Sequence, residues 1–137
     1  MYERILVPVD LAHADKLGKA LAIATDLAKH YRASICCVGV TGSAPTHAAH
    51  DPEEFAEKLD SFAAEQSRKR GFEFEPVMMV RPDPLRGLAD ALDDAIKEQS
   101  ADLVVMASHV PTFMDHILSS NAGYLASHAS TSVFIVR

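Results

Sequence analysis

The segment Ile35-Cys36-Cys37-Val38-Gly39-Val40 decides the fold, because nearly every position in it is apolar. A strand with one wet face alternates apolar and polar residues, whereas a continuous apolar run is typical of a strand buried on both faces, as in parallel sheets. In a strand, the adjacent side chains of Cys36 and Cys37 point to opposite faces, which disfavours a disulfide or a metal pair between them. The segment therefore predicts an interior strand of a parallel sheet, with both cysteines as reduced packing residues.

Other segments of strand length lie on both sides of this one. The alternating run Phe72–Glu75 is followed by Pro76, which a sheet tolerates at its edge because proline has no N–H to pair. This pattern predicts an edge strand that continues to Val80. The remaining predicted strands are the apolar runs Ile5–Val9, Leu103–Met106 and Val133–Val136.

Helical patterns separate the predicted strands. The clearest start is Asp51-Pro52-Glu53-Glu54, since aspartate caps helices, proline suits the first position and acids suit the positive end of the helix dipole. Gly71 is placed to end that helix. The other helices are expected over Leu17–Tyr31, from Asp83-Pro84 through Ile96, and from Ser119-Ser120-Asn121 to near Ala129.

Strands and helices thus alternate along the whole chain in the order βαβαβαβαβ. This order predicts an α/β fold with an open, mostly parallel five-stranded sheet and helices on both faces. The chain has 137 residues, of which 48% are hydrophobic and 23% charged, and these values fit one globular domain over residues 1–137.

The charge balance bears on partners and location. A formal net charge of -6 disfavours nonspecific binding to nucleic acid or to anionic lipid, because there is no basic surplus to displace counterions. The apolar run after Met1–Arg4 is too short for a signal-peptide core, and no run has the length of a spanning helix. We therefore expect a cytoplasmic protein with no membrane insertion.

In open parallel sheets, ligands bind at the carboxyl ends of strands near the point where strand order reverses. This rule selects three segments, which are Pro8-Val9-Asp10, Val40-Thr41-Gly42 and the segment that begins with Ala107-Ser108-His109. Ser119, Ser120 and Asn121 join them if the intervening loop folds back. Hydroxyls and free backbone N–H groups at a helix start are suited to phosphate.

Each of these residues also has an ordinary structural interpretation. The serines at 119 and 120 are good helix caps, and Asp10 is typical of an acid that caps the loop after a buried strand. His109 is equally compatible with loop packing. The sequence alone therefore leaves a ligand site and a set of caps as alternatives.

Several other chemistries are disfavoured. His47 and His50 lie in a loop beside Asp51, and this spacing is weak evidence for a metal site. The sequence has no phosphate loop of the GxxxxGK[ST] type, no GxGxxG after the first strand and no GxSxG elbow. A phosphorylation receiver would carry an acidic pair after its first strand and a lysine after its fifth, whereas Asp10 stands alone and Arg137 follows the last strand.

Two motifs at opposite ends of the chain are more specific. Arg4–Asp10 is similar to the first strand of the universal stress protein family. Leu103–His109, Leu118–Ala122 and His128–Arg137 resemble the carboxyl-terminal motif of the same family, in the same order. The likeness covers essentially the whole chain.

The resemblance implies the family's nucleotide-binding α-hydrolase-like fold, with strand order 3-2-1-4-5, and a homodimer. In the nucleotide-binding branch, the aspartate after the first strand contacts adenosine, the end of the second strand borders adenine, and the turn after the fourth strand holds the phosphates. The ligand would be ATP or AMP, with or without Mg²⁺. By matching motif, the contacts fall on Asp10 with its neighbours Pro8 and Val9, on Val40, on Met106 to His109, and on Ser119, Ser120 and Asn121.

The phosphate turn departs from the family's common pattern of Gly, two residues, Gly, nine residues, then Gly-Ser or Gly-Thr. Ala107, Val110 and Ser119 stand at the three glycine positions, and the loop is one residue shorter. The string Ala-Ser-His, one residue, Pro, followed by Ser-Asn-Ala, is similar to a shorter-loop subgroup, against which only Ser119 is unusual. Pro82 also stands where glycine often precedes the Asp-Pro pair.

Two functions follow as expectations. The first is a stress-response regulator that binds an adenine nucleotide, is not an enzyme, and acts on an unidentified regulatory protein. The alternative is an interaction module of the same fold that binds no nucleotide, because glycines that allow close backbone approach are missing. In both, an apolar fifth strand at the sheet edge invites pairing, which predicts a dimer interface on Ser132, Val133, Phe134, Ile135 and Val136.

Overall fold

The apolar segment around Cys36 and Cys37 forms strand β2 (Ser34–Thr41), which has a parallel neighbour on each side and is buried along most of its length. The computed structural model of the protein describes residues 1–45, 49–82, 88–107 and 131–137. The prediction of a doubly buried strand is confirmed, and β2 extends one residue further at each end than the apolar run.

All five predicted strands are present in one parallel sheet of order β3-β2-β1-β4-β5, which confirms the expected fold class and strand order. The outer strand β3 contains Pro76, as expected for an edge strand. The other bounds are β1 (Arg4–Pro8), β3 (Phe74–Val80), β4 (Leu103–Ala107) and β5 (Ser132–Val136).

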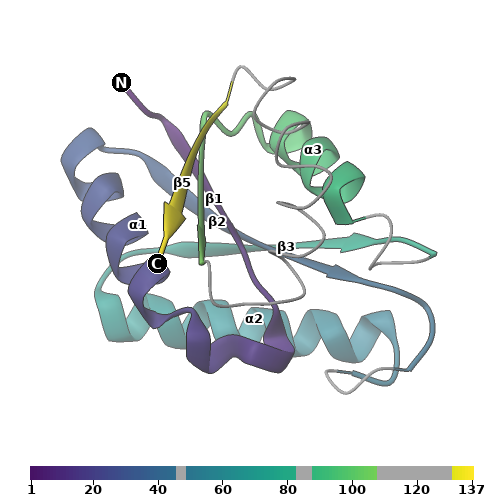
Figure 1. The fold of residues 1–137 in the computed structure, drawn as a ribbon. Helices are drawn as coiled ribbons and strands as arrows, with labels where there is room; N and C mark the ends of the chain where they lie inside the picture. The colour runs from purple at the N-terminus through teal and green to yellow at the C-terminus, as the bar shows by residue number, and fades with distance from the viewer. Residues whose placement is uncertain (46–48, 83–87, 108–130) are drawn as a thin grey trace.

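Helices cover both faces of the sheet (Figure 1). Helices α1 (Gly18–Tyr31) and α2 (Pro52–Arg70) lie on one face, and α3 (Leu88–Gln99) lies on the other. The helix starts predicted at Asp83-Pro84 and at Ser119 lie outside the described residues. Within the described residues, no helix is both long enough and apolar enough to cross a membrane.

A short 3₁₀ helix, η1 (Leu11–Lys16), precedes α1 and was not expected from the sequence. None of its residues is buried, so it leaves no apolar periodicity in the sequence. It connects the end of β1 to the start of α1, so its geometry sets the positions of the residues that follow β1.

Helix α2 begins and ends where the sequence indicates. The Asp51 carboxylate accepts a hydrogen bond from the Glu54 backbone N–H at 2.7 Å, and the Glu54 carboxylate accepts one from the His50 N–H at 2.8 Å. The His50 N–H is also the main cause of the lowered pKa of Glu54. Gly71 ends the helix in the left-handed conformation, with φ 61°.

The amino-terminal edge of the sheet is held by a polar network. The Asp102 carboxylate accepts hydrogen bonds from the backbone N–H groups of Glu3 and Arg4 at 2.9 and 3.0 Å. The Arg4 guanidinium pairs with Glu75 at 2.7 Å and donates to Gln99 at 2.6 Å. These contacts join β1, β3 and α3 at the amino-terminal edge of the sheet.

Candidate functional site

The reversal of strand order lies at β1. From β1 the chain moves outward to β2 and then β3, and it returns to add β4 on the other side of β1. Because all the strands are parallel, the ends of β1, β2 and β4 meet at one edge of the sheet. Ligands of open α/β sheets bind at such a position. The described residues of the three predicted segments lie there, namely Pro8 to Asp10, Val40 to Gly42, and Met106 with Ala107.

Asp10 is the polar residue at the end of β1. Its side chain is only 18% exposed, and both carboxylate oxygens have partners in η1. Oδ1 accepts a hydrogen bond from the Ala12 backbone N–H at 3.0 Å, which caps the short helix. The expectation that Asp10 could be a cap is thus confirmed, and the cap fixes the carboxylate in one orientation at the strand end.

His13 is the second partner of Asp10, and the sequence patterns did not single it out. Its Nδ1 lies 2.9 Å from Asp10 Oδ2, and its side chain is 44% exposed. The backbone of His13 (φ -128°, ψ 35°) interrupts the helical conformation of η1. An acid at the end of a buried strand with a histidine three positions later is the signal that could have identified this pair.

The apolar residues predicted at the site are buried or half-buried at the strand ends. Pro8, Val9, Met106 and Ala107 are buried, and Val40 is half-buried. The Val9 backbone N–H donates to the Val38 carbonyl at 2.8 Å and so extends the β1–β2 pairing beyond β1. Of the three residues predicted at the end of β1, which are Pro8, Val9 and Asp10, only Asp10 has an ionisable side chain.

The phosphate side of the prediction lies outside the described residues. This part consists of Ser108, His109, Ser119, Ser120 and Asn121. Their proposed contacts stay a prediction from the sequence.

Neither metal ligation nor thiol chemistry has support in the described part of the chain. Those residues contain no group of three histidine, cysteine, aspartate or glutamate side chains that could hold a metal ion. Cys36 and Cys37 are buried free thiols. Burial raises the pKa of Cys36 to about 11 and that of Cys37 to about 12, so neither is a thiolate at neutral pH.

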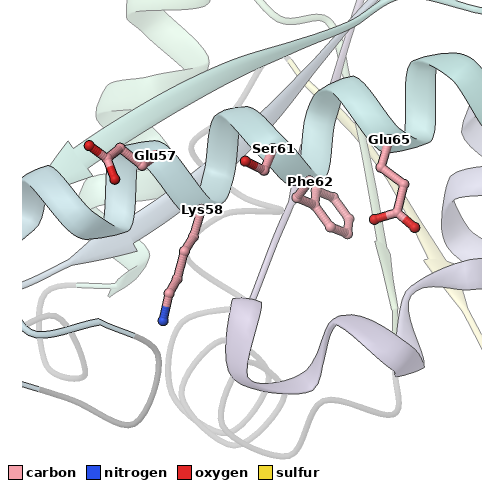
Figure 2. A pocket seen from close by; sticks show the side chains of 5 residues that line it. All are labelled: Glu57, Lys58, Ser61, Phe62 and Glu65. Atoms are coloured by element: carbon pink, nitrogen blue, oxygen red, sulfur yellow. The ribbon is translucent and has the colours of Figure 1, made fainter.

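A hollow of about 370 Å³ lies along α2, and Figure 2 shows the side chains that line it. Four of these side chains are exposed and Phe62 is half-buried, so this is a surface feature with mixed charge. It includes none of the residues predicted at the carboxyl edge. The lining residues are Glu57, Lys58, Ser61, Phe62 and Glu65.

Strand β5 is the outer strand next to β4 and carries exposed apolar side chains. Val133 is 37% exposed and Phe134 is 42% exposed, while Ile135 is half-buried and Val136 is buried. Together with the exposed Ser132, these are the five residues predicted to form a dimer interface. An exposed apolar edge of this kind offers unpaired backbone groups to a second strand.

Comparisons with known proteins agree with this architecture. The model of the universal stress protein family matches residues 1–137. The chain is 30% identical to universal stress protein G of Shigella flexneri, over 100% of both sequences. The structure of a universal stress protein from Archaeoglobus fulgidus aligns with a TM-score of 0.70 at 23% identity, over 100% of both chains. A universal stress protein from the same organism in complex with dAMP aligns with a TM-score of 0.65 at 23% identity, over 99% of this chain and 98% of the other.

Proposed function

This chain belongs to the universal stress protein family, and from that premise we propose that it is a stress-response regulator that binds an adenine nucleotide. The observation that carries the proposal is the orientation of Asp10, whose carboxylate is fixed by η1 at the carboxyl end of β1, beside the reversal of strand order.

The proposed contacts divide between the two halves of the nucleotide. Asp10 accepts hydrogen bonds from the adenosine part, and Val40 borders the adenine ring. The phosphates lie toward Ser119, Ser120 and Asn121, where hydroxyls and backbone N–H groups at a helix start would receive them. A helix end contributes on the order of 1 kcal/mol, so we expect micromolar rather than tighter affinity.

A related complex supports the class of ligand. A universal stress protein from Archaeoglobus fulgidus with the same fold has a solved structure in complex with dAMP, an adenine nucleotide. We extend this ligand class to the present chain as ATP or AMP. Mg²⁺ would arrive with the phosphates of ATP, because in nucleotide sites this ion is held largely by phosphate oxygens and water.

We propose binding without catalysis. Phosphoryl transfer needs a metal clamp and a group that orients the nucleophile. Asp10, the acid at this edge, is engaged with Ala12 and His13 on the adenosine side of the proposed site. We expect ATP turnover far below the ordinary enzyme range, and a steady-state rate of about 1 per second or above would contradict this.

The proposal includes a homodimer through β5, acting in the cytoplasm on a regulatory protein. The exposed side chains of Val133 and Phe134 support the dimer, since pairing of β5 with a second copy would bury them. The two free cysteines are in keeping with a reducing compartment.

A second candidate function has its own support. The exposed apolar edge of β5 would serve an interaction module equally well without any nucleotide. Ala107, Val110 and Ser119, which replace the family's glycines, favour this alternative because a Cβ limits close approach to a phosphate.

Titration calorimetry with ATP and AMP separates the two functions. Loss of a hydrogen bond to a charged group predicts about tenfold or more weaker binding for Asp10→Ala, and a smaller, about fivefold loss for Ser120→Ala. Asp15→Ala is the matched control, because it removes an exposed carboxylate from the same short helix. If the wild-type protein binds neither nucleotide at millimolar concentration, the nucleotide proposal fails and the interaction module takes its place.

A further inference from the structure

The pairing of Asp10 with His13 raises a question of charge at the proposed site. A carboxylate beside a nucleotide repels the phosphates, and the chain as a whole already carries a formal charge of -6. A cationic partner on the carboxylate would offset that repulsion. His13 is in the right position, with Nδ1 2.9 Å from Asp10 Oδ2.

The geometry gives the two oxygens of Asp10 different roles. Oδ1 receives the Ala12 N–H as a helix cap, and Oδ2 faces the His13 ring. A carboxylate oxygen has more than one lone pair, so each oxygen can still accept a bond from a ligand. With both oxygens held by η1, the carboxylate cannot rotate freely, and its orientation depends on His13.

Imidazole is the side chain whose charge ordinarily changes between about pH 5 and 8. In its neutral form His13 can donate a hydrogen bond to Asp10 and leave the carboxylate charge in place. In its protonated form it donates the same bond and also cancels that charge. Only the second state presents a neutral pair to an anionic ligand.

We infer that His13 is the positioning and charge-compensating partner of Asp10, and that its protonation strengthens the binding of anionic adenine nucleotides at this edge of the sheet. The inference rests on the proposed nucleotide site. It assigns to the chain a pH-dependent affinity for AMP and ATP that uncharged adenosine does not share.

Other charged groups lie on the elements that follow Asp10 and on α2, which covers the same face of the sheet as α1 (Figure 1). On η1 and the first turn of α1 they are Asp15, Lys16 and Lys19, and in the hollow on α2 they are Glu57, Lys58 and Glu65. Carboxylates and ammonium groups ordinarily keep their charge between about pH 6 and 8, so they supply a constant field over that range. The chain has seven histidines, so the effect must be assigned to His13 by substitution.

The test compares affinities for AMP and adenosine at about pH 6 and about pH 8 in three proteins. His13→Gln keeps a neutral donor, and His13→Lys carries a fixed positive charge. For each protein we take the ratio of its AMP affinity at about pH 6 to its AMP affinity at about pH 8. We expect this ratio to be larger in the wild type than in His13→Gln by about fivefold or more, because the wild type binds AMP more tightly at low pH. His13→Lys should bind AMP tightly at both pH values.

Two controls keep the comparison specific. The phosphate of AMP also gains a proton near pH 6, which acts in the opposite direction, and His13→Gln measures that contribution alone. His30→Gln removes a histidine at the far end of α1, where the centroid of its ring lies 4.7 Å from that of the Tyr31 ring. This variant should keep the wild-type dependence of AMP affinity on pH. Binding is reciprocal, so AMP should also increase the protonated fraction of His13 followed by NMR at fixed pH.

The outcomes separate this inference from the proposed function. If AMP binds and His13→Gln keeps the wild-type pH profile, the role of His13 is wrong while the nucleotide site stands. The role of His13 is also wrong if adenosine shows the full pH dependence, because charge would then not be the cause. If none of the folded proteins binds AMP or adenosine at any pH, the proposed function fails and the inference fails with it.

Discussion

The ring of Phe55 on α2 lies against the backbone of Gly39 on β2, so closely that a Cβ at position 39 would stand 2.8 Å from Cε1 and Cζ of the ring. Leu59, one turn further along α2, would be 3.3 Å from the same atom. Real Cβ contacts are essentially never this short, so helix and strand approach each other here only because Gly39 has no side chain.

Gly39→Ala should therefore destabilise the fold. The added methyl group must displace the ring of Phe55 inside a packed interface, and overpacking of this kind costs about 1–3 kcal/mol. Urea unfolding measures the difference in the free energy of unfolding. Gly18→Ala is the matched control, because a Cβ there meets nothing within 4 Å and a helix favours alanine over glycine. Equal stability of the two variants would refute the packing argument.

Asp51→Ala should weaken α2 at its first turn. The variant loses the carboxylate that accepts the Glu54 N–H at 2.7 Å, and loss of an N-cap costs about 1 kcal/mol. Asp51→Ser should restore most of the stability because serine also caps helices. Asp60→Ala removes an exposed carboxylate from the middle of the same helix and serves as the control. Thermal unfolding that ranks Asp60→Ala below Asp51→Ala would overturn the assignment.

Alkaline pH should destabilise the protein through Cys36 and Cys37. Burial raises their pKa values from an ordinary 9.0 to about 11 and about 12, so the folded thiols hold their protons to higher pH than the unfolded thiols do. The free energy of unfolding is then unaffected below the unfolded pKa, and it falls as pH rises from there toward the folded values. The loss by about pH 10 is on the order of 2 kcal/mol.

The measurement is urea unfolding at about pH 8 and about pH 10, in wild type and in a Cys36→Ala, Cys37→Ala variant. Removal of the two sulfurs lowers stability at both pH values, so the informative quantity is the change between them. This change should be smaller in the variant by the amount given above. An identical change in both proteins would show that the buried thiols do not contribute.

Phe134→Asp should convert the proposed dimer into a monomer. A carboxylate on the outer strand β5 would be buried without a partner when a second copy pairs there, and the cost of such burial is large. Val80→Asp is a close control, because Val80 is also 42% exposed but lies on β3, at the opposite edge of the sheet. Sedimentation at micromolar concentration should find a dimer for Val80→Asp and for wild type. A wild-type monomer would remove the dimer from the proposed function.

The sheet was predictable because its strands are long apolar runs that leave a continuous signal in the sequence. Burial on both faces explains why Ile35 to Val40 shows no alternation, and Pro76 marks the strand that pairs on one side only. The order of strands needed the resemblance to a family, since local patterns of hydrophobicity do not say which strands become neighbours.

The site was predictable only where a motif follows a strand directly. Asp10 was found in this way, whereas His13 was not, because η1 buries no residue and so leaves no pattern. A histidine three positions after an acid has no particular meaning until a turn brings Nδ1 and Oδ2 within 2.9 Å of each other. The contact between Gly39 and Phe55 was missed for a similar reason, as it joins two elements whose separation is set by packing.

The position of β1 in the sheet has a consequence for the growing chain. This strand is made first, yet one of its two edges pairs with β4, and the Asp102 carboxylate that receives the Glu3 N–H lies 99 positions later. At a synthesis rate of about 5–20 residues per second, the free edge of β1 waits roughly 5–20 s for its partner. During that interval the nascent chain exposes the unpaired edge of β1, and an unpaired strand edge can pair with another chain. Completion of the fold is therefore a late, long-range step, and it limits the speed of folding more than the local helices do.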